Sequence, residues 1–447
     1  MDVEMALRWV RDNIENFGGD PDRVTLSGQS SGSVLAQLLL QKADEDETKR
    51  LFERVILQSG VADNPWATNS KQTSVESSAS LSSLLGCDHG SKYGAVVHEM
   101  ECLGNKSMEE ILTMTEHVEM YGKEFRLTVD GYDEDTVGRS VAIPESVLNH
   151  SDAARMNATT TIATSSMAEN PDPLTVNGAK RSSSERKIEV LVGSNADEGS
   201  LLMAMSRWPF FCCGTRSDDD LNLDTFKKVV RSFLGDLSYC SSSWLIESNY
   251  HSGTVKGVIR FLTDYFYQCD VMKTAADLKV NNGHHVYTYL FDANFEFASK
   301  AFPYLGAGNS LEQLAIWGRP FVKPDLYTKG EIQLSGTAIY FWKEFVHGKM
   351  NETYLGWGGM KEGQAFLLSK EEDDNGRIVE YKNKNCQWLK CLRDGQAGNQ
   401  GPIQPGRREW CSLVMMTAGA GAASMSLVKP FTLILVLVSA IMSGRQS

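Results

Sequence analysis

Several patterns that would assign a function class at once are missing from this sequence. Its 447 residues carry a formal net charge of −13 without a stripe of Lys and Arg, which disfavours nucleic-acid binding. The nine cysteines include no Cys-x-x-Cys pair and no paired histidines support them, so we expect no metal site and no cofactor. Internal repeats are absent as well. A hydrophobic fraction of 42% suffices for the core of one large domain.

A long apolar run is also missing. The apolar block near the C-terminus, residues 431–442, is short for a membrane span, which needs about twenty residues. Small residues at 417–424 precede it, separated by a short spacer. Small residues, spacer and apolar tail favour a cleaved signal for a glycolipid (GPI) anchor over a transmembrane segment. We therefore predict an anchor signal at 417–447 and a Gly/Gln/Pro-rich stalk at 396–416.

The pattern that is present, and informative, is Gly28-Gln29-Ser30-Ser31-Gly32. A β-branched run at 24–26 precedes it and a helical pattern at 34–40 follows, which favours a G-x-S-x-G nucleophile elbow over an ordinary Gly/Ser turn. Such an elbow holds a serine on a sharp turn at the edge of a sheet. The glycines are expected because side chains there would collide where the backbone doubles back. Ser30 is the candidate nucleophile, and the N–H of Ser31 is a candidate oxyanion donor.

Further motifs around the elbow resemble those of the type-B carboxylesterase family. They are the segment 6–14, Phe17-Gly18-Gly19-Asp20-Pro21, Leu57-Gln58-Ser59-Gly60 and Asn64-Pro65-Trp66-Ala67. The last of these is similar to the cholinesterase branch. The resemblance covers most of residues 1–395 and implies an α/β-hydrolase fold, in which a mixed, mostly parallel sheet is flanked by helices. It also implies a carboxylic-ester substrate and a Ser, Glu, His triad in chain order.

The resemblance supplies a second triad member. Residues 188–193 form a continuous apolar strand pattern, followed shortly by Asp197-Glu198-Gly199-Ser200. The family carries its acid in a D-E-G-S tetrapeptide after such a strand, which assigns the role to Glu198. That acid would hold the imidazole tautomer and stabilise the imidazolium. An isolated acidic pair would otherwise be interpreted as the start of a surface loop.

The third member is replaced. The family histidine stands nine residues before a Gly-x-Pro, and counting back from Gly318-Arg319-Pro320 leads to Asn309. An asparagine amide cannot take the serine proton near neutral pH. Loss of the base costs a serine hydrolase about a million-fold in turnover. None of the eight histidines of the chain has a motif context that favours a catalytic role over a surface or structural one.

A second departure concerns the start of the chain. Residue 1 already falls in the helix that precedes the elbow strand. In the family, the secretory signal, the first strands, the His-Gly-Gly oxyanion loop and a choline-cradling tryptophan all come earlier. We therefore expect a hydrolase domain at 1–395 that is incomplete at its N-terminus, with the oxyanion loop absent. Within this domain, the Ser/Thr-rich segment 152–187 is expected to be a flexible insertion.

Substrate preference is less determined. Trp66 matches a tryptophan that lines the acyl pocket in the family, with core packing as the alternative. Leu201 and Leu202 stand where cholinesterases place aromatic side chains, and aliphatic groups cannot supply cation–π attraction. Gln29 replaces a carboxylate that many cholinesterases carry beside the serine. The acidic charge would steer a cationic ligand, but it serves solubility equally well.

Cysteines and sequons favour an extracellular protein at the cell surface. The resemblance implies disulfides Cys87–Cys102 and Cys269–Cys386, and a subunit-linking role for Cys411 in a homodimer. No partner is evident for Cys212, Cys213, Cys240 or Cys391. N-glycosylation sequons occur at Asn105, Asn149, Asn157 and Asn351.

Two hypotheses follow from the sequence. In the first, the chain is a cholinesterase-like serine ester hydrolase by descent, with Ser30 and Glu198 retained and turnover impaired by Asn309. In the second, it is a non-catalytic cell-surface protein that uses the hydrolase fold for adhesion or ligand binding. Retention of Ser30 and Glu198 favours the first, and Asn309 favours the second.

Overall fold

A computed structural model describes residues 2–45, 51–88, 95–120, 126–129, 187–205, 223–234, 244–250, 254–350, 361–371 and 376–397. The predicted stalk and anchor signal lie outside these residues, apart from 396 and 397, and so does the predicted insertion, apart from Lys187. Outside them too are Cys411 and three of the four sequons, Asn149, Asn157 and Asn351. Within the described residues, no helix combines the length and apolar character needed to cross a membrane.

The centre of the fold is a six-stranded sheet in the order β1-β2-β5-β6-β7-β8. The first five strands in this order run parallel, and β8 joins β7 antiparallel at the edge. The strands are β1 (Thr25–Gln29), β2 (Arg54–Gln58), β5 (Glu189–Asn195), β6 (His285–Asp292), β7 (Gln364–Ser369) and β8 (Ile378–Glu380). A separate parallel pair is formed by β3 (Thr68–Ser70) and β4 (Leu127–Val129).

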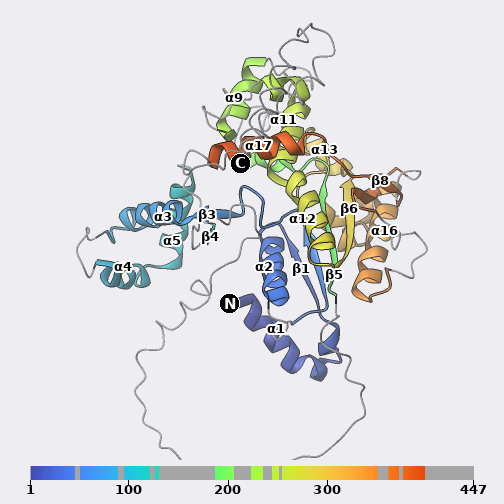
Figure 1. The fold of residues 1–447 in the computed structure, drawn as a ribbon, viewed down its shortest axis with the longest axis horizontal. Helices are drawn as coiled ribbons and strands as arrows, with labels where there is room; N and C mark the ends of the chain where they lie inside the picture. Colours follow the sequence, from blue (N-terminus) through green and yellow to red (C-terminus); the bar gives the residue numbers. More distant parts are fainter. Residues whose placement is uncertain are drawn as a thin grey trace, which may run out of the picture. The chain divides into compact units, whose positions relative to one another are not determined.

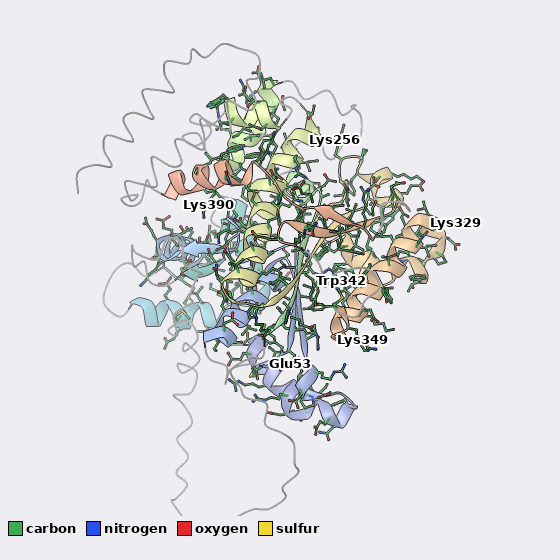
Figure 2. The ribbon with its side chains drawn as sticks, turned by 45° about the vertical axis from the view of Figure 1, so that its right-hand side comes forward. Glu53, Lys256, Lys329, Trp342, Lys349 and Lys390 are labelled. Carbon is green, nitrogen blue, oxygen red and sulfur yellow. A yellow bond between two sulfur atoms is a disulfide. The ribbon has the colours of Figure 1, made fainter. Side chains whose placement is uncertain are left out.

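Helices cover both faces of the sheet (Figure 1). Side chains alternate along each strand, so Val55 and Leu57 of β2 pack on one face with α2 (Ser31–Glu45) and α12 (Cys269–Val280). Ile56 points to the other face and packs with α16 (Lys329–Val346). Trp342 of α16 lies toward the sheet, 5.1 Å from the ring of Tyr289, whereas Lys329 and Lys349 lie at the outside of this layer (Figure 2). This confirms the predicted mixed, mostly parallel sheet flanked by helices.

The α-helices are α1 (Asp2–Asn13), α2 (Ser31–Glu45), α3 (Lys71–Leu84), α4 (Ala95–Gly104), α5 (Met108–Met120), α7 (Gly199–Met205), α9 (Leu223–Leu234), α11 (Val255–Thr263), α12 (Cys269–Val280), α13 (Glu296–Ala301), α14 (Glu312–Ile316), α15 (Arg319–Val322), α16 (Lys329–Val346) and α17 (Cys386–Ala397). Between α11 and α12 a π-helical turn spans Asp264–Gln268. The capping box at the start of α16 shows how local sequence sets a boundary, because Thr328 and Glu331 satisfy each other's backbone N–H groups.

The chain divides into two compact units. The first comprises Met1–Gly214 and Leu262–Lys382 and contains the whole sheet. The second comprises Thr215–Phe261 and Asn383–Ser447. In the second unit the buried Trp388 of α17 contacts the ring of Tyr250, which in turn packs edge-on against Phe261. The unit thus has an aromatic core of its own.

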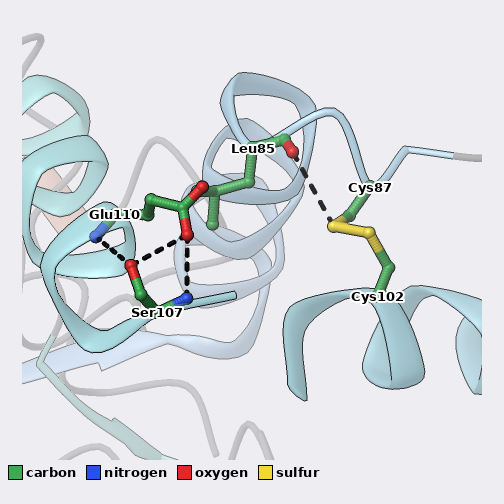
Figure 3. The surroundings of a disulfide bond; sticks show 5 residues. All are labelled: Leu85, Cys87, Cys102, Ser107 and Glu110. Atoms are coloured by element: carbon green, nitrogen blue, oxygen red, sulfur yellow. Dashed lines mark hydrogen bonds between the residues drawn. A yellow bond between two sulfur atoms is a disulfide. The ribbon is translucent and has the colours of Figure 1, made fainter. Parts of the chain in front are cut away.

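A disulfide joins Cys87 to Cys102, which confirms the predicted short-loop pair (Figure 3). It connects the segment after α3 to α4. Shortly after, Ser107 caps α5: its Oγ accepts from the Glu110 N–H, and a Glu110 carboxylate oxygen accepts from the Ser107 N–H (Figure 3). Asn105, in the sequon before this cap, is exposed.

Three further cysteines, Cys269, Cys386 and Cys391, are disulfide-bonded. The bonding of the first two is compatible with the predicted Cys269–Cys386 pair, which stays a prediction. No pattern in the sequence indicates a partner for Cys391, and the structure shows that it is disulfide-bonded.

Candidate active site

The candidate site lies where the parallel strands end. Since β1, β2 and β5 run parallel, their carboxyl ends meet at one edge of the sheet, which is where open α/β sheets bind ligands. Ser30 follows β1, Ser59 follows β2, and Glu198 stands three residues beyond β5. The fold therefore gathers residues that are far apart in the sequence.

Ser30 adopts the sharp turn that a nucleophile elbow requires. Its φ is +54°, in the left-handed region that non-glycine residues rarely occupy. Its N–H donates to the Gln58 carbonyl at 2.8 Å, and its own carbonyl accepts from the N–H groups of Ser33 and Val34 at 3.0 and 3.2 Å. Ser30 therefore extends the pairing of β1 with β2 by one residue. Its carbonyl also accepts the first backbone hydrogen bonds of α2. Backbone strain of this kind typically costs about 1–3 kcal/mol and concentrates at functional sites.

The two glycines of the elbow are not equivalent. A Cβ on Gly28 would lie 2.1 Å from the Gly32 carbonyl oxygen, so the backbone itself excludes a side chain there. A Cβ on Gly32 would meet nothing within 4 Å. The expectation that both glycines relieve a collision is confirmed for Gly28 and is wrong for Gly32, because Gly32 faces open space.

Ser31 is the first residue of α2, as the oxyanion hypothesis requires. An N–H in the first turn of a helix has no intrahelical acceptor, and the helix dipole favours negative charge there. The Ser31 N–H is therefore a suitable donor for an oxyanion that forms at Ser30. Whether it acts in this role stays a prediction.

Glu198, the second residue of the D-E-G-S tetrapeptide, is completely buried. One carboxylate oxygen accepts from the Asn195 backbone N–H at 2.8 Å, and the other accepts from Asn309 Nδ2 at 2.7 Å. The loop that carries Asn309 is tied to the same place, because Asp197 and Ala307 exchange two hydrogen bonds of 3.0 and 2.9 Å. Asp197 and Glu198 therefore form part of the site, and the alternative of a surface loop does not apply.

The electrostatics of this carboxyl are unfavourable. Burial, aided by the charge of the buried Glu312, raises the pKa of Glu198 to about 8. The hydrogen bonds from the Asn195 N–H and from Asn309 act in the opposite direction, and so does the nearby hydroxyl of Ser59. Burial likewise raises the pKa of Glu312. Asn195 joins the two carboxyls, since its side-chain Nδ2 donates to Glu312 at 2.6 Å.

Asn309 occupies the position that faces the acid. It is buried, and its amide is bonded at both ends. Nδ2 donates to Glu198, whereas Oδ1 accepts from Gln29 Nε2 at 3.0 Å and from Ser310 Oγ at 2.9 Å. Gln29 immediately precedes Ser30. The structure thus brings Ser30, Glu198 and Asn309 into one site, with an amide where the family resemblance expects an imidazole.

The histidines whose side chains are described lie in other surroundings. His284 contacts Asp44 at 3.1 Å. His285 begins β6 and lies at the amino ends of the strands, whereas Ser30 lies at their carboxyl ends. His117 and His347 each contact the carbonyl four residues earlier in their own helix. His347 is the C-cap of α16, which is a structural role. Within this part of the chain, no group of three or more His, Cys, Asp or Glu side chains is arranged to hold a metal ion.

Trp66 lies beside the elbow. Its Nε1 donates to the Phe266 carbonyl at 3.0 Å, and its ring packs on Tyr267. A Cβ on Gly60 would lie 2.5 Å from the Ser30 carbonyl oxygen and 3.1 Å from the Trp66 ring, so the indole comes close to the nucleophile turn. The side chain is partly buried, which suits either a pocket wall or a core contact. Leu201 and Leu202, on α7, are partly buried as well.

Sequence reasoning missed two contributors. Ser59 has a φ of +52° after β2 and influences Glu198, and Ser310 has a φ of +69° beside Asn309. With Ser30, these are the non-glycine residues of positive φ in the described part of the chain. A signal for Ser59 was present, because Gln58-Ser59-Gly60 ends a parallel neighbour of β1.

Comparison with known proteins agrees with this geometry. The profile of the Carboxylesterase family matches residues 1–389. The chain belongs to this family. The family has the α/β-hydrolase fold, which confirms the fold expected from the motifs.

The curated relatives of the chain include three acetylcholinesterases. Acetylcholinesterase 4 of Caenorhabditis briggsae is 24% identical over 431 residues, which cover 88% of this chain and 63% of that protein. The acetylcholinesterase of Gallus gallus is 38% identical over 111 residues (25% of this chain, 14% of that protein). The acetylcholinesterase of Danio rerio is 34% identical over 134 residues (29% and 20%). These matches agree with the cholinesterase branch, and the chain spans less than two thirds of the length of these relatives.

Proposed function

We propose that the chain is a cholinesterase-like serine carboxylic-ester hydrolase by descent, with little or no turnover in its present form. Ser30 is the nucleophile, Glu198 the acid, and Asn309 stands in the position of the base. The observation that carries this proposal is the 2.7 Å hydrogen bond from Asn309 Nδ2 to the buried carboxylate of Glu198. That bond is the one a triad histidine would donate to its acid.

The chemistry of the site follows from these groups. Ser30 sits on a strained turn at the start of α2, so attack on an ester carbonyl would place the oxyanion near the Ser31 N–H. Asn309 cannot accept the hydroxyl proton of Ser30. An amide oxygen is too weak a base, and Asn309 Oδ1 already accepts two hydrogen bonds. Acylation of Ser30 is therefore slow, and deacylation, which needs the same base to activate water, is slow as well.

The substrate class is a small carboxylic ester. The relatives named above are acetylcholinesterases, and Trp66 beside the elbow suits the wall of an acyl pocket. Leu201 and Leu202 supply no aromatic face for a quaternary ammonium group, so cation–π recognition is lacking at these positions. A cationic ligand would gain only from the net acidic charge.

The environment of the protein is part of the same proposal. We infer an extracellular protein at the cell surface, held by a GPI anchor signalled by 417–447 on a stalk at 396–416. Cys411 would link two copies, and Asn105, Asn149, Asn157 and Asn351 would carry N-glycans. Support comes from the disulfide Cys87–Cys102, because such bonds persist in oxidising compartments.

A second candidate function is favoured by one observation. The Asn309 amide is hydrogen-bonded at both ends and closes the site with groups of the chain itself. Such a site serves no reaction, and the fold would then act as a cell-surface scaffold for adhesion or for binding a ligand.

The experiment compares the natural chain with Asn309→His, using Asn309→Gln as a matched control that keeps an amide. We expect Asn309→His to raise hydrolysis of an activated acetate ester by about 10²–10⁴-fold, the usual contribution of a general base. Asn309→Gln should leave the rate at the level of the natural chain. A fluorophosphonate probe should label the natural chain slowly, and the Ser30→Ala variant should not be labelled.

Two outcomes decide between the candidates. Absence of labelling at Ser30 would contradict the hydrolase proposal. A fully folded Asn309→His variant without ester turnover would favour the non-catalytic scaffold.

A further inference from the structure

Gln29 holds an unusual position beside the nucleophile. It is the last residue of β1, and both hydrogens of its side-chain amide are used on the loop that carries Asn309. Its Nε2 donates to Asn309 Oδ1 at 3.0 Å and to Ser310 Oγ at 2.9 Å. Ser310 Oγ also donates to Asn309 Oδ1 at 2.9 Å. These three side chains form a closed set, which we call the amide lock.

The amide lock determines which way the Asn309 amide points. A flipped amide would turn its NH₂ group toward two donors, Gln29 and Ser310, and its oxygen toward the Glu198 carboxyl. The contact with Gln29 would lose its hydrogen bond, because Gln29 Nε2 can only donate, whereas a hydroxyl or a protonated carboxyl can reverse its role. The orientation with Nδ2 on Glu198 is therefore fixed from the side of Gln29 rather than by Glu198 alone.

We propose that Gln29 is a positioning residue for Asn309, and that the two amides function as a matched pair in place of an acid–base pair. The inference rests on the proposed function in one respect, namely that position 309 is the place of the triad base. The contacts themselves need no activity. As a consequence, the contribution of Gln29 to the stability of the protein depends on which residue occupies position 309.

A histidine at position 309 shows this dependence. With the same side-chain torsions, its Nδ1 takes the place of Asn309 Nδ2, and its Cδ2 takes the place of Oδ1. The Gln29 N–H would then face a C–H group and lose an acceptor. A carboxylate at position 29 behaves in the opposite way, because it repels the Asn309 oxygen and attracts an imidazolium.

The first test is a stability cycle on the full chain, which does not depend on activity. Gln29→Ala should lower the Tm of the natural protein by about 2–4 °C, the usual effect of losing a hydrogen bond or two. In the Asn309→His background, the same substitution should lower the Tm by only about half as much, because the bond from Gln29 to Ser310 is then the one left to lose. Equal losses in both backgrounds would overturn the proposal, since they would show that Gln29 acts independently of Asn309.

The second test uses Gln29→Glu, which keeps the size of the side chain in case the alanine variant does not fold. In the natural background it should lower the Tm, because two oxygens then face each other. In the Asn309→His background it should raise the pH of the acid limb of kcat/KM by about 0.5–1 unit, with Glu198 and Glu312 as the other titratable groups in contact with the site.

The results separate the two proposals. An acid limb that does not move in the Gln29→Glu, Asn309→His variant would contradict the contact between the two side chains. If Asn309→His has no turnover, the hydrolase proposal fails, and the stability cycle still supports or overturns the pairing of Gln29 with Asn309.

Discussion

Charged groups and backbone strain are distributed differently at the two ends of the parallel sheet. At the amino ends of the strands, Arg54 pairs with Glu189 at 2.5 Å, and His284 contacts Asp44 at 3.1 Å. At the carboxyl ends, two carboxyls are buried together, and serines adopt left-handed backbone conformations. One end places basic side chains next to acidic ones, whereas the other holds groups in states that cost stability.

This difference indicates where the fold was shaped by something other than stability. Strained serines and a carboxyl with a raised pKa persist only where the surrounding structure enforces them. Here that structure is the β1–α2 turn, the end of β2 and the loop at 306–310. The site keeps this costly arrangement although position 309 carries no base.

The largest expected effect is at the turn itself. Gly28→Ala should destabilise the protein by about 3 kcal/mol or more, because the new methyl group would lie 2.1 Å from a backbone oxygen. Gly32→Ala is the matched control, and it should be neutral or stabilise α2 by up to about 1 kcal/mol. Urea unfolding of both variants measures this. A similar loss in both would show that the close approach at Gly28 is not specific.

The next effect concerns pH at the carboxyl end. The pKa of Glu198 is about 8 in the folded protein, above its ordinary value of 4.5, so the folded state binds the extra proton between these values. The contribution of Glu198 to stability is therefore fully present below about pH 4.5 and is lost as the pH rises to about 8. The slope should approach about 1.4 kcal/mol per pH unit.

Glu198→Gln removes this titration and keeps the shape of the side chain. Unfolding free energies measured from pH 5 to 8 should fall more steeply in the natural chain than in this variant. Parallel pH profiles would contradict the raised pKa of Glu198. They would also show that the two ends of the sheet do not differ in how their acidic groups titrate.

The smallest effect is expected at the amino end. Glu189→Gln breaks the pair with Arg54, whose side chains are 16–17% exposed, and should cost about 1 kcal/mol. The matched control is Glu296→Gln, which breaks an exposed pair with Lys300 and should cause no measurable change. Thermal unfolding at low and high salt compares the two. A loss at Glu189 as large as that at Gly28 would show that the amino end is also under constraint.

Much of the fold was predictable because its signals are short in sequence. The β-branched run, the Gly-x-Ser-x-Gly turn and the following helix are contiguous, and the structure places them as β1, Ser30 and α2. The apolar strand before the D-E-G-S tetrapeptide is equally local, and it became β5 with Glu198 buried at its end. Asn309 was located by its spacing to Gly318, and the structure puts it in contact with Glu198.

What sequence reasoning missed depends on packing between distant segments. The bond from Gln29 to Asn309 joins residues 280 positions apart, and no local pattern encodes it. The burial of Glu198, which raises its pKa together with the charge of the buried Glu312, also arises only in the folded sheet. The open space beside Gly32 is a third case, because a motif cannot show which of its glycines is sterically required.

The hydrogen bond between Asn309 and Glu198 has a consequence for how this chain could change over generations. Every asparagine codon becomes a histidine codon through a single base substitution, and the acid that would receive the new ring is already aligned. A return to proton transfer at this position thus lies one mutational step away. Gln29, chemically matched to the amide, would be the next residue placed under selection.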